Sequence, residues 1–317
     1  MQTKTGSRLL TPSQQAYSLC NMRGVVLIAI GGVGYLRWAN NMAVSLKTHS
    51  PNLPIQILVS KELFVEALSG GFFDVVTLVQ DEMWKDENGR LFPAKLKTSF
   101  YHLVDFEEFI YLDVDGCILK DITPLFECKE DLCSDVQGVY DTTQGEVFNH
   151  LKWAKPNAIW EHFGLKKEDR LPAINSSFLF VRKGQNTQDV FNLAHELLMN
   201  NPLPYEKHWY VWGRRKDHKV SQPDELYFNV AMAKLGIVPS HNVVILFRMI
   251  NDLCEFTTYN EVKEKFYGVG LFGQLETNHR RMREIYNTAM KEMWRDKTGQ
   301  PFYDKCEILS KSKFAVI

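Results

Sequence analysis

The sequence contains no paired-cysteine motif and no long apolar run, and each absence argues against a class of protein. Its six cysteines, in 317 residues, form no CxxC pair and follow no repeated spacing. This pattern argues against a zinc site or a disulfide framework and favours reduced thiols, including Cys128 and Cys133. No stretch reaches the roughly 18 apolar residues of a membrane-spanning helix, and the first 24 residues lack the apolar core of a signal peptide. We therefore expect a cytoplasmic protein.

The sequence also lacks an excess of either charge. Its 37 Lys and Arg residues balance 38 Asp and Glu residues, which gives a formal net charge of −1. Such a chain has no overall attraction to nucleic acid or to an anionic membrane, so a local group of residues has to recognise any partner. We found no internal repeat and no low-complexity tract. With 45% hydrophobic residues, the chain can build a sizeable core.

Apolar runs and helical patterns alternate along the first 112 residues. The β-branched run at 25–30 predicts a buried strand, and a glycine turn follows it at 31–34. Further strands are predicted at 53–59, 74–79 and 109–112, with helices at 35–49, 61–68 and 93–104. This alternation predicts an α/β fold with a Rossmann-like, mostly parallel sheet and helices on both faces. Ligands then bind at the carboxyl ends of the strands.

The second half of the chain is less regular. We predict strands at 177–181 and 243–247, helices at 190–199 and 224–235, and an irregular segment at 200–222. The charged tail from 275 onwards is mostly helical. The expected organisation is a polar N-terminal segment at 1–23, a main α/β domain at 24–274 and a C-terminal helical extension at 275–317.

Two carboxylates, Asp113 and Asp115, follow the apolar strand in the run FIYLDVDG at 109–116. In a strand, a spacing of two residues places both side chains on one face. Hard oxygen ligands on one face suit Mg²⁺ or Mn²⁺ holding a diphosphate. Such a triplet also occurs on solvated turns, but here the segments on both sides of it look buried, which favours the metal site.

The run at 109–126 resembles, almost position by position, the metal-binding region of the glycogenin-like family eight of retaining glycosyltransferases. The likeness extends over about 24–270 and includes the segments 29–35 and 43–46 and the pair Asn175 and Ser176. It is imperfect at 224–229, where Glu225 stands in place of a glutamine. The resemblance implies a GT-A fold of the nucleotide-diphospho-sugar transferase type. It also implies transfer of a sugar from a nucleoside diphosphate sugar, most often a UDP-sugar, to an acceptor hydroxyl with retention. The implied cofactor is Mn²⁺ or Mg²⁺.

The resemblance, together with the local chemistry, gives an expected set of site residues. Asp113 and Asp115 are the expected metal ligands, with His279 as a substitute third ligand because the segment 266–270 lacks the family's histidine. Asp224, Glu225 and Asn175 are the expected catalytic residues. The expected donor-binding residues are Ile30, Gly31, Gly32, Tyr35, Lys95, Asp113, Val114, Asp115, Asn175 and Ser176, with Lys97 as an alternative to Lys95.

Several of these residues also have an ordinary structural interpretation. Glycines permit tight turns, Tyr35 sits where a helix starts, and Asp224 sits where an N-cap is expected.

The acceptor is expected at the segment 208–219, which combines aromatic rings with clustered cations. Trp209, Trp212, Arg214 and Arg215 are the candidate acceptor-binding residues. Rings suit carbohydrate faces and cations suit phosphates, so a saccharide, a protein side chain and a hydroxylated DNA base all stay open as acceptors. A nucleotidyltransferase and a catalytically inert sugar-nucleotide binding protein are the alternative functions.

Overall fold

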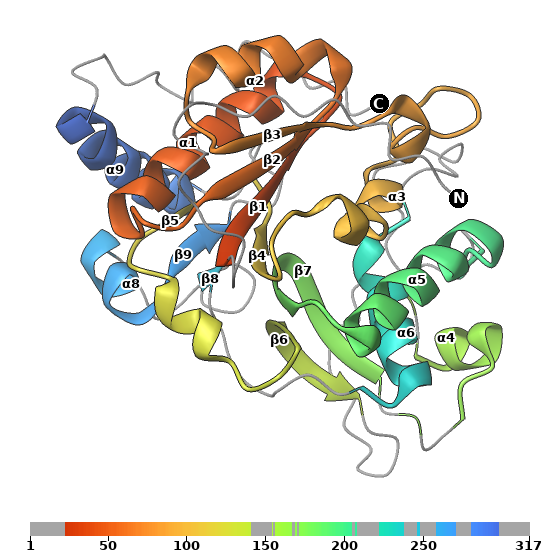
Figure 1. The fold of residues 1–317 in the computed structure, drawn as a ribbon. Helices are drawn as coiled ribbons and strands as arrows, with labels where there is room; N and C mark the ends of the chain where they lie inside the picture. The colour runs from red at the N-terminus through yellow and green to blue at the C-terminus, as the bar shows by residue number, and fades with distance from the viewer. Residues whose placement is uncertain are drawn as a thin grey trace. The chain divides into compact units, whose positions relative to one another are not determined.

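The computed structural model describes residues 23–140, 154, 156–166, 169, 171–204, 207, 222–237, 246–247, 258–270 and 280–297. The chain divides into two compact units (Figure 1). The first unit comprises Met1–Val79, Glu108–Glu127 and Ile245–Ile317, and the second comprises Gln80–Glu107 and Cys128–Val244.

The first unit contains four parallel strands in the order β3-β2-β1-β4. These are β1 (Arg23–Ala29), β2 (Ile55–Val59), β3 (Val75–Leu78) and β4 (Glu108–Leu112). Helix α1 (Val33–His49) connects β1 to β2, and η2 (Lys61–Leu63) with α2 (Phe64–Gly70) connects β2 to β3. The strands are mostly buried, as expected for parallel strands covered by helices. The predicted mostly parallel α/β fold is therefore confirmed.

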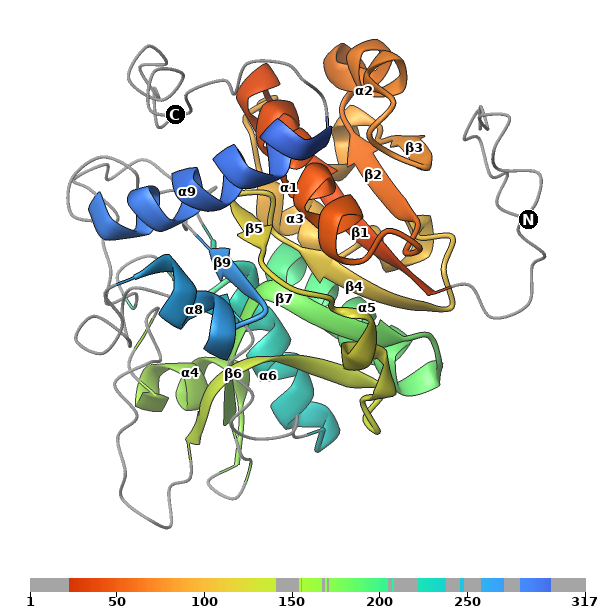
Figure 2. The ribbon, with the colours of Figure 1, turned by 90° about the vertical axis from the view of Figure 1, so that its left-hand side faces the viewer.

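A smaller sheet in the first unit joins distant parts of the chain. Its strands are β5 (Gly116–Ile118), β9 (Gly268–Gly270) and β8 (Leu246–Phe247), in the order β5-β9-β8. The remaining elements are η5 (Thr123–Glu127), α8 (Tyr259–Lys265) and α9 (Arg280–Lys297). Helix α9 lies across α1 and also contacts β5 (Figure 2). The expected C-terminal extension thus supplies a helix that packs on the first unit.

The second unit contains one antiparallel strand pair, β6 (Leu132–Tyr140) with β7 (Leu171–Arg182). Helices α5 (Gln185–Asn200) and α6 (Asp224–Leu235) pack on each other, and α6 packs on β7. The rings of Phe100, Phe191 and Phe228 form a buried cluster between these helices and η4, with centroids 5.4 and 5.0 Å apart. The unit also contains η3 (Asp81–Met83), α3 (Pro93–Lys97), η4 (Phe100–Leu103) and α4 (Pro156–Phe163).

Three sequence-based expectations need correction. The helix expected at 93–104 is interrupted, because α3 ends at Lys97 and η4 begins at Phe100. Asp113 and Asp115 follow β4 in a loop and do not lie within the strand. Cys128 and Cys133 form a disulfide, although reduced thiols were expected. Cys128 lies in the loop before β6 and Cys133 lies in β6 itself, and sequence spacing alone gave no sign of this contact.

Among the helices that the structure describes, none combines the length and the apolar character that crossing a membrane demands.

Candidate functional site

The glycine turn after β1 leads directly into α1. Gly31 has a φ of 79°, a left-handed conformation that favours glycine. Gly32 is the N-cap residue of α1, and the N–H of Tyr35 donates to its carbonyl at 3.1 Å. The Tyr35 side chain is 36% exposed and packs edge-on against Trp38. The predicted donor-binding residues Gly31, Gly32 and Tyr35 therefore lie together at the N-terminal end of α1, next to the buried Ile30.

The loop between β4 and β5 carries Asp113, Val114 and Asp115. The hydroxyl of Tyr111, the residue two before Asp113, donates to Asp113 Oδ1 at 2.5 Å. Gly116 then pairs with Gly270 across the antiparallel β5–β9 ladder. A Cβ atom on Gly116 would lie 2.3 Å from the carbonyl oxygen of Val269. The loop is thus held by a hydrogen bond before it and a close backbone contact after it.

The end of β1 and the β4–β5 loop come together in the first unit. The pKa of Tyr35 is raised by burial and then by the charges of Asp115 and Asp113. Both carboxylates therefore act on the same phenol at the start of α1. The first turn of α1, which the structure describes in full, carries no acidic residue. Its N–H groups and the positive end of the helix dipole remain suited to an anion.

The two loop carboxylates fit a cation that is shared with a phosphate ligand. Within the described part of the chain, no group of three or more His, Cys, Asp or Glu side chains is placed to hold a metal. Mg²⁺, however, is usually bound by one or two carboxylates together with substrate phosphates. Gly270 lies opposite Gly116 and has no side chain to offer as a ligand. His279, the predicted third ligand, lies outside the described residues.

A second cluster of predicted residues lies in the second unit, where β7 meets α6. Ser176 Oγ donates to Asp224 Oδ2 at 2.5 Å, and Lys97 Nζ lies 3.6 Å from the same oxygen. The side chains of Lys97 and Asp224 are only 17% and 15% exposed. Asp224 opens α6 and is thus anchored by one strand residue and one residue of α3.

Further hydrogen bonds occur within β7 and between the β7 backbone and α6. Asn175 Oδ1 accepts hydrogen bonds from the backbone N–H and the hydroxyl of Ser177. Asn229 Oδ1, on α6, accepts from the N–H of Ile174 at 3.1 Å. Ser176 and Asp224 are therefore in direct contact, Asn175 precedes Ser176 in β7, and the half-buried Glu225 follows Asp224 in sequence.

The two candidate lysines of α3 have different partners. Lys95 Nζ donates to the carbonyl of Lys85 at 3.2 Å, whereas Lys97 contacts Asp224. Lys97, the second choice from the sequence, is therefore the one that joins other predicted site residues. A role for Lys95 stays a prediction.

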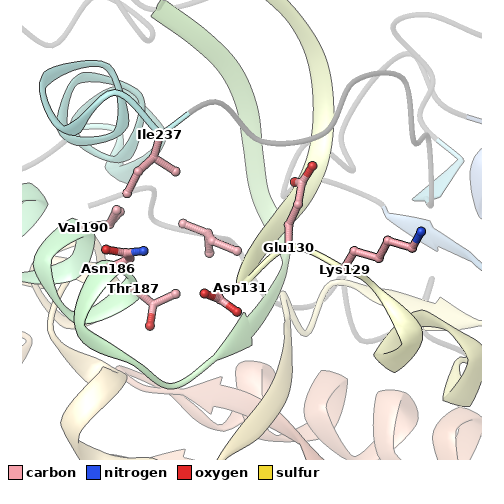
Figure 3. A pocket seen from close by; sticks show the side chains of 8 residues that line it. Lys129, Glu130, Asp131, Asn186, Thr187, Val190 and Ile237 are labelled. Atoms are coloured by element: carbon pink, nitrogen blue, oxygen red, sulfur yellow. The ribbon is translucent and has the colours of Figure 1, made fainter.

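The predicted acceptor-binding residues Trp209, Trp212, Arg214 and Arg215 lie outside the described residues. A separate pocket of about 260 Å³ opens in the second unit between the segment 129–132, the first turns of α5 and Ile237 (Figure 3). None of the predicted site residues lines this pocket.

No protein-family model and no curated protein sequence matches this chain. Solved structures do match it. The galactosyltransferase LgtC in complex with donor and acceptor sugar analogues has a TM-score of 0.54 and 15% identity, over 89% of this chain and 98% of its own. An active-site mutant of LgtC, in which a glutamine is replaced by glutamate, gives a TM-score of 0.51 with the same identity and coverage.

The bifunctional glycosyltransferase WbbM also matches, with a TM-score of 0.54 and 9% identity. The match covers 87% of this chain and 52% of WbbM. At such identities the likeness establishes the fold, which is the GT-A fold of these glycosyltransferases.

Proposed function

We propose that this chain is a metal-dependent glycosyltransferase that moves a sugar from a UDP-sugar to an acceptor hydroxyl. The observation that carries the proposal is the placement of Asp113 and Asp115 beside Tyr35 at the N-terminal end of α1, within a GT-A fold. The glycogenin-like resemblance of the run at 109–126 adds retention at the anomeric carbon to the proposal.

In this proposal the first unit binds the nucleoside diphosphate. Asp113 and Asp115 hold Mn²⁺ or Mg²⁺, which supplies positive charge to the departing diphosphate. The N–H groups at the start of α1 bind phosphate oxygens. The Tyr35 ring, edge-on to Trp38 and partly exposed, stacks on the base.

The residues where β7 meets α6 bind the sugar. Asp224 already accepts a hydrogen bond from Ser176 and contacts Lys97, so its carboxylate has a fixed orientation. Oriented carboxylates and amides are suited to hold sugar hydroxyls during transfer. We assign this role to Asp224 and Asn175, and we assign Glu225 to the position that a glutamine occupies in the family. The LgtC mutant shows that a glutamine-to-glutamate change of this kind has been made in the active site of a protein with this fold.

The acceptor is proposed to be a saccharide, a protein side chain or a hydroxylated DNA base. The cytoplasmic location stays a prediction, and the Cys128–Cys133 disulfide is a bond more usual in oxidising compartments. An inert sugar-nucleotide binding protein is the second candidate. The observation that favours it is Gly270, which pairs with Gly116 and has no side chain that could bind a metal next to the loop of Asp113 and Asp115.

The test is to incubate the protein with Mn²⁺ and a panel of nucleoside diphosphate sugars and to measure free diphosphate. Asp113→Asn and Asp115→Asn should lower the rate on the order of 10²-fold or more, because they weaken binding of the cation whose positive charge would stabilise the leaving diphosphate. Asp81→Asn is the matched control, since this exposed carboxylate pairs with Lys85 in the second unit. Full activity in the two loop variants rejects the site. Donor binding without any diphosphate release favours the inert protein.

A further inference from the structure

Tyr111 lies in β4 and presents its hydroxyl to the loop that follows. Its side chain is 2% exposed, and its hydroxyl donates to Asp113 Oδ1 at 2.5 Å. Asp113 comes directly after Leu112, the last residue of β4, so Tyr111 bonds to the first residue of the loop. A phenol has a single proton to donate, and here that proton goes to a carboxylate of the loop.

This hydrogen bond restrains the side chain of Asp113. The terminal torsion of an aspartate is broad and has no sharply preferred angle. A donor fixed in a buried strand removes that freedom for Asp113. In metal sites, hydrogen bonds of this kind orient the ligating groups, and their loss typically lowers metal affinity about 10–100-fold.

We propose that Tyr111 is a positioning residue for the cation site: its hydroxyl holds the Asp113 carboxylate in the orientation that binds the metal. The inference rests on the proposed function, because it takes Asp113 as a metal ligand. It adds a residue of the apolar strand β4 to the proposed site.

A purely structural role for the Tyr111 hydroxyl is the competing explanation. Tyr101 provides the comparison, because it is also buried and its hydroxyl donates to the carbonyl of Gly184 in the second unit. Tyr101→Phe and Tyr111→Phe remove the same atom from two buried rings. A structural role predicts similar effects on stability for both variants and no effect of either on metal binding.

The experiment is a titration of Mn²⁺ in the presence of UDP, followed by the electron paramagnetic resonance signal of free Mn²⁺, on the full chain. We expect Tyr111→Phe to raise the Kd for Mn²⁺ about 10–100-fold and Tyr101→Phe to leave it unchanged. Excess Mn²⁺ should then restore the diphosphate-release rate of Tyr111→Phe. In an Asp113→Asn background, Tyr111→Phe should have no further effect on the Kd.

A Kd for Tyr111→Phe within twofold of the wild-type value overturns the inference. The inference is also overturned if Tyr111→Phe still weakens Mn²⁺ binding in the Asp113→Asn background. Failure of the proposed function gives a different result, because the wild-type protein with UDP then binds no Mn²⁺ at all. Circular dichroism of each variant confirms that the compared proteins are folded.

Discussion

Gly116 follows Asp115 and pairs with Gly270 of strand β9. A Cβ atom there would lie 2.3 Å from the Val269 carbonyl oxygen and 3.3 Å from its carbon. The neighbouring atoms belong to the backbone of a paired strand, which cannot move aside without breaking the β5–β9 ladder. Lack of space therefore requires glycine at this position.

Gly116→Ala should lower the free energy of unfolding by about 2–3 kcal/mol, because overpacking a tight site forces the backbone to shift. Urea unfolding followed by circular dichroism measures this change. Gly34→Ala is the control: it lies within α1 with nothing within 4 Å of the added Cβ. Gly34 is the second residue of α1, and alanine in a helix is favoured over glycine, so this variant should be as stable as the wild type or more stable by up to about 1 kcal/mol. Equal effects of the two substitutions contradict the explanation.

At the residue scale, the sequence predicted groups whose chemistry is local. Asp113 and Asp115 were predicted as metal ligands because the segments on both sides of them look buried. The sequence alone could not distinguish Lys95 from Lys97, because the distinction depends on the contact of Lys97 with Asp224. In the sequence, Tyr111 was interpreted only as part of an apolar strand. Its position two residues before Asp113 was visible there and could have suggested the hydrogen bond between them.

At the scale of elements, His195 ties α5 to the end of α3. Its Nδ1 lies 3.0 Å from Thr98 Oγ1. The pKa of His195 is lowered by burial and by the nearby charge of Lys95, which outweigh a hydrogen bond to the backbone of Lys95. The folded protein therefore disfavours protonation of this half-buried ring.

The sign of the resulting pH dependence follows from linkage. The unfolded chain binds a proton at His195 near the ordinary value of 6.5, while the folded chain binds it only at lower pH. Stability should therefore fall as the pH drops below about 6.5, and it should continue to fall until the lowered pKa is reached. Urea midpoints measured between pH 7.5 and 5 should decrease more for the wild type than for His195→Gln. Parallel pH profiles of the two proteins would count against this role.

Helices and strands could be predicted from the sequence where consecutive residues are apolar and buried. The four parallel strands of the first unit follow from apolar runs, and α6 has the predicted bounds. Strand β7 starts at Leu171, six residues before the prediction, because Asn175, Ser176 and Ser177 are buried polar residues within it. Their partners include Asp224 and one another, which local composition does not reveal. After Lys97, the hydroxyls of Thr98 and Ser99 bond back to carbonyls of α3, where the predicted helix is interrupted.

At the scale of the whole molecule, the first unit is built from three separate parts of the chain. The C-terminal part contributes α9, which is joined to α1 through Asn41. The Asn41 side chain donates to the Tyr286 hydroxyl and accepts from Trp294 Nε1, each at 3.1 Å. The α/β class and the GT-A resemblance were visible in the sequence. The sequence did not show that the segments 80–107 and 128–244 form one compact unit, because the order of elements does not show which segments contact each other.

This construction predicts that α9 is indispensable to the first unit. A chain ending at residue 274, the expected domain boundary, loses the buried side chains Ile285, Tyr286, Met290 and Met293. Each such side chain contributes roughly 2 kcal/mol when buried, or on the order of 8 kcal/mol together. The whole stability of a typical protein is only about 5–15 kcal/mol. The truncated chain should therefore unfold or aggregate, as measured by circular dichroism and by the rate of proteolysis. A chain ending at Lys297 keeps every described contact of α9 and should retain the fold. If the chain ending at residue 274 folds as stably as this control, α9 is an appendage and the boundary expected from the sequence is the correct one.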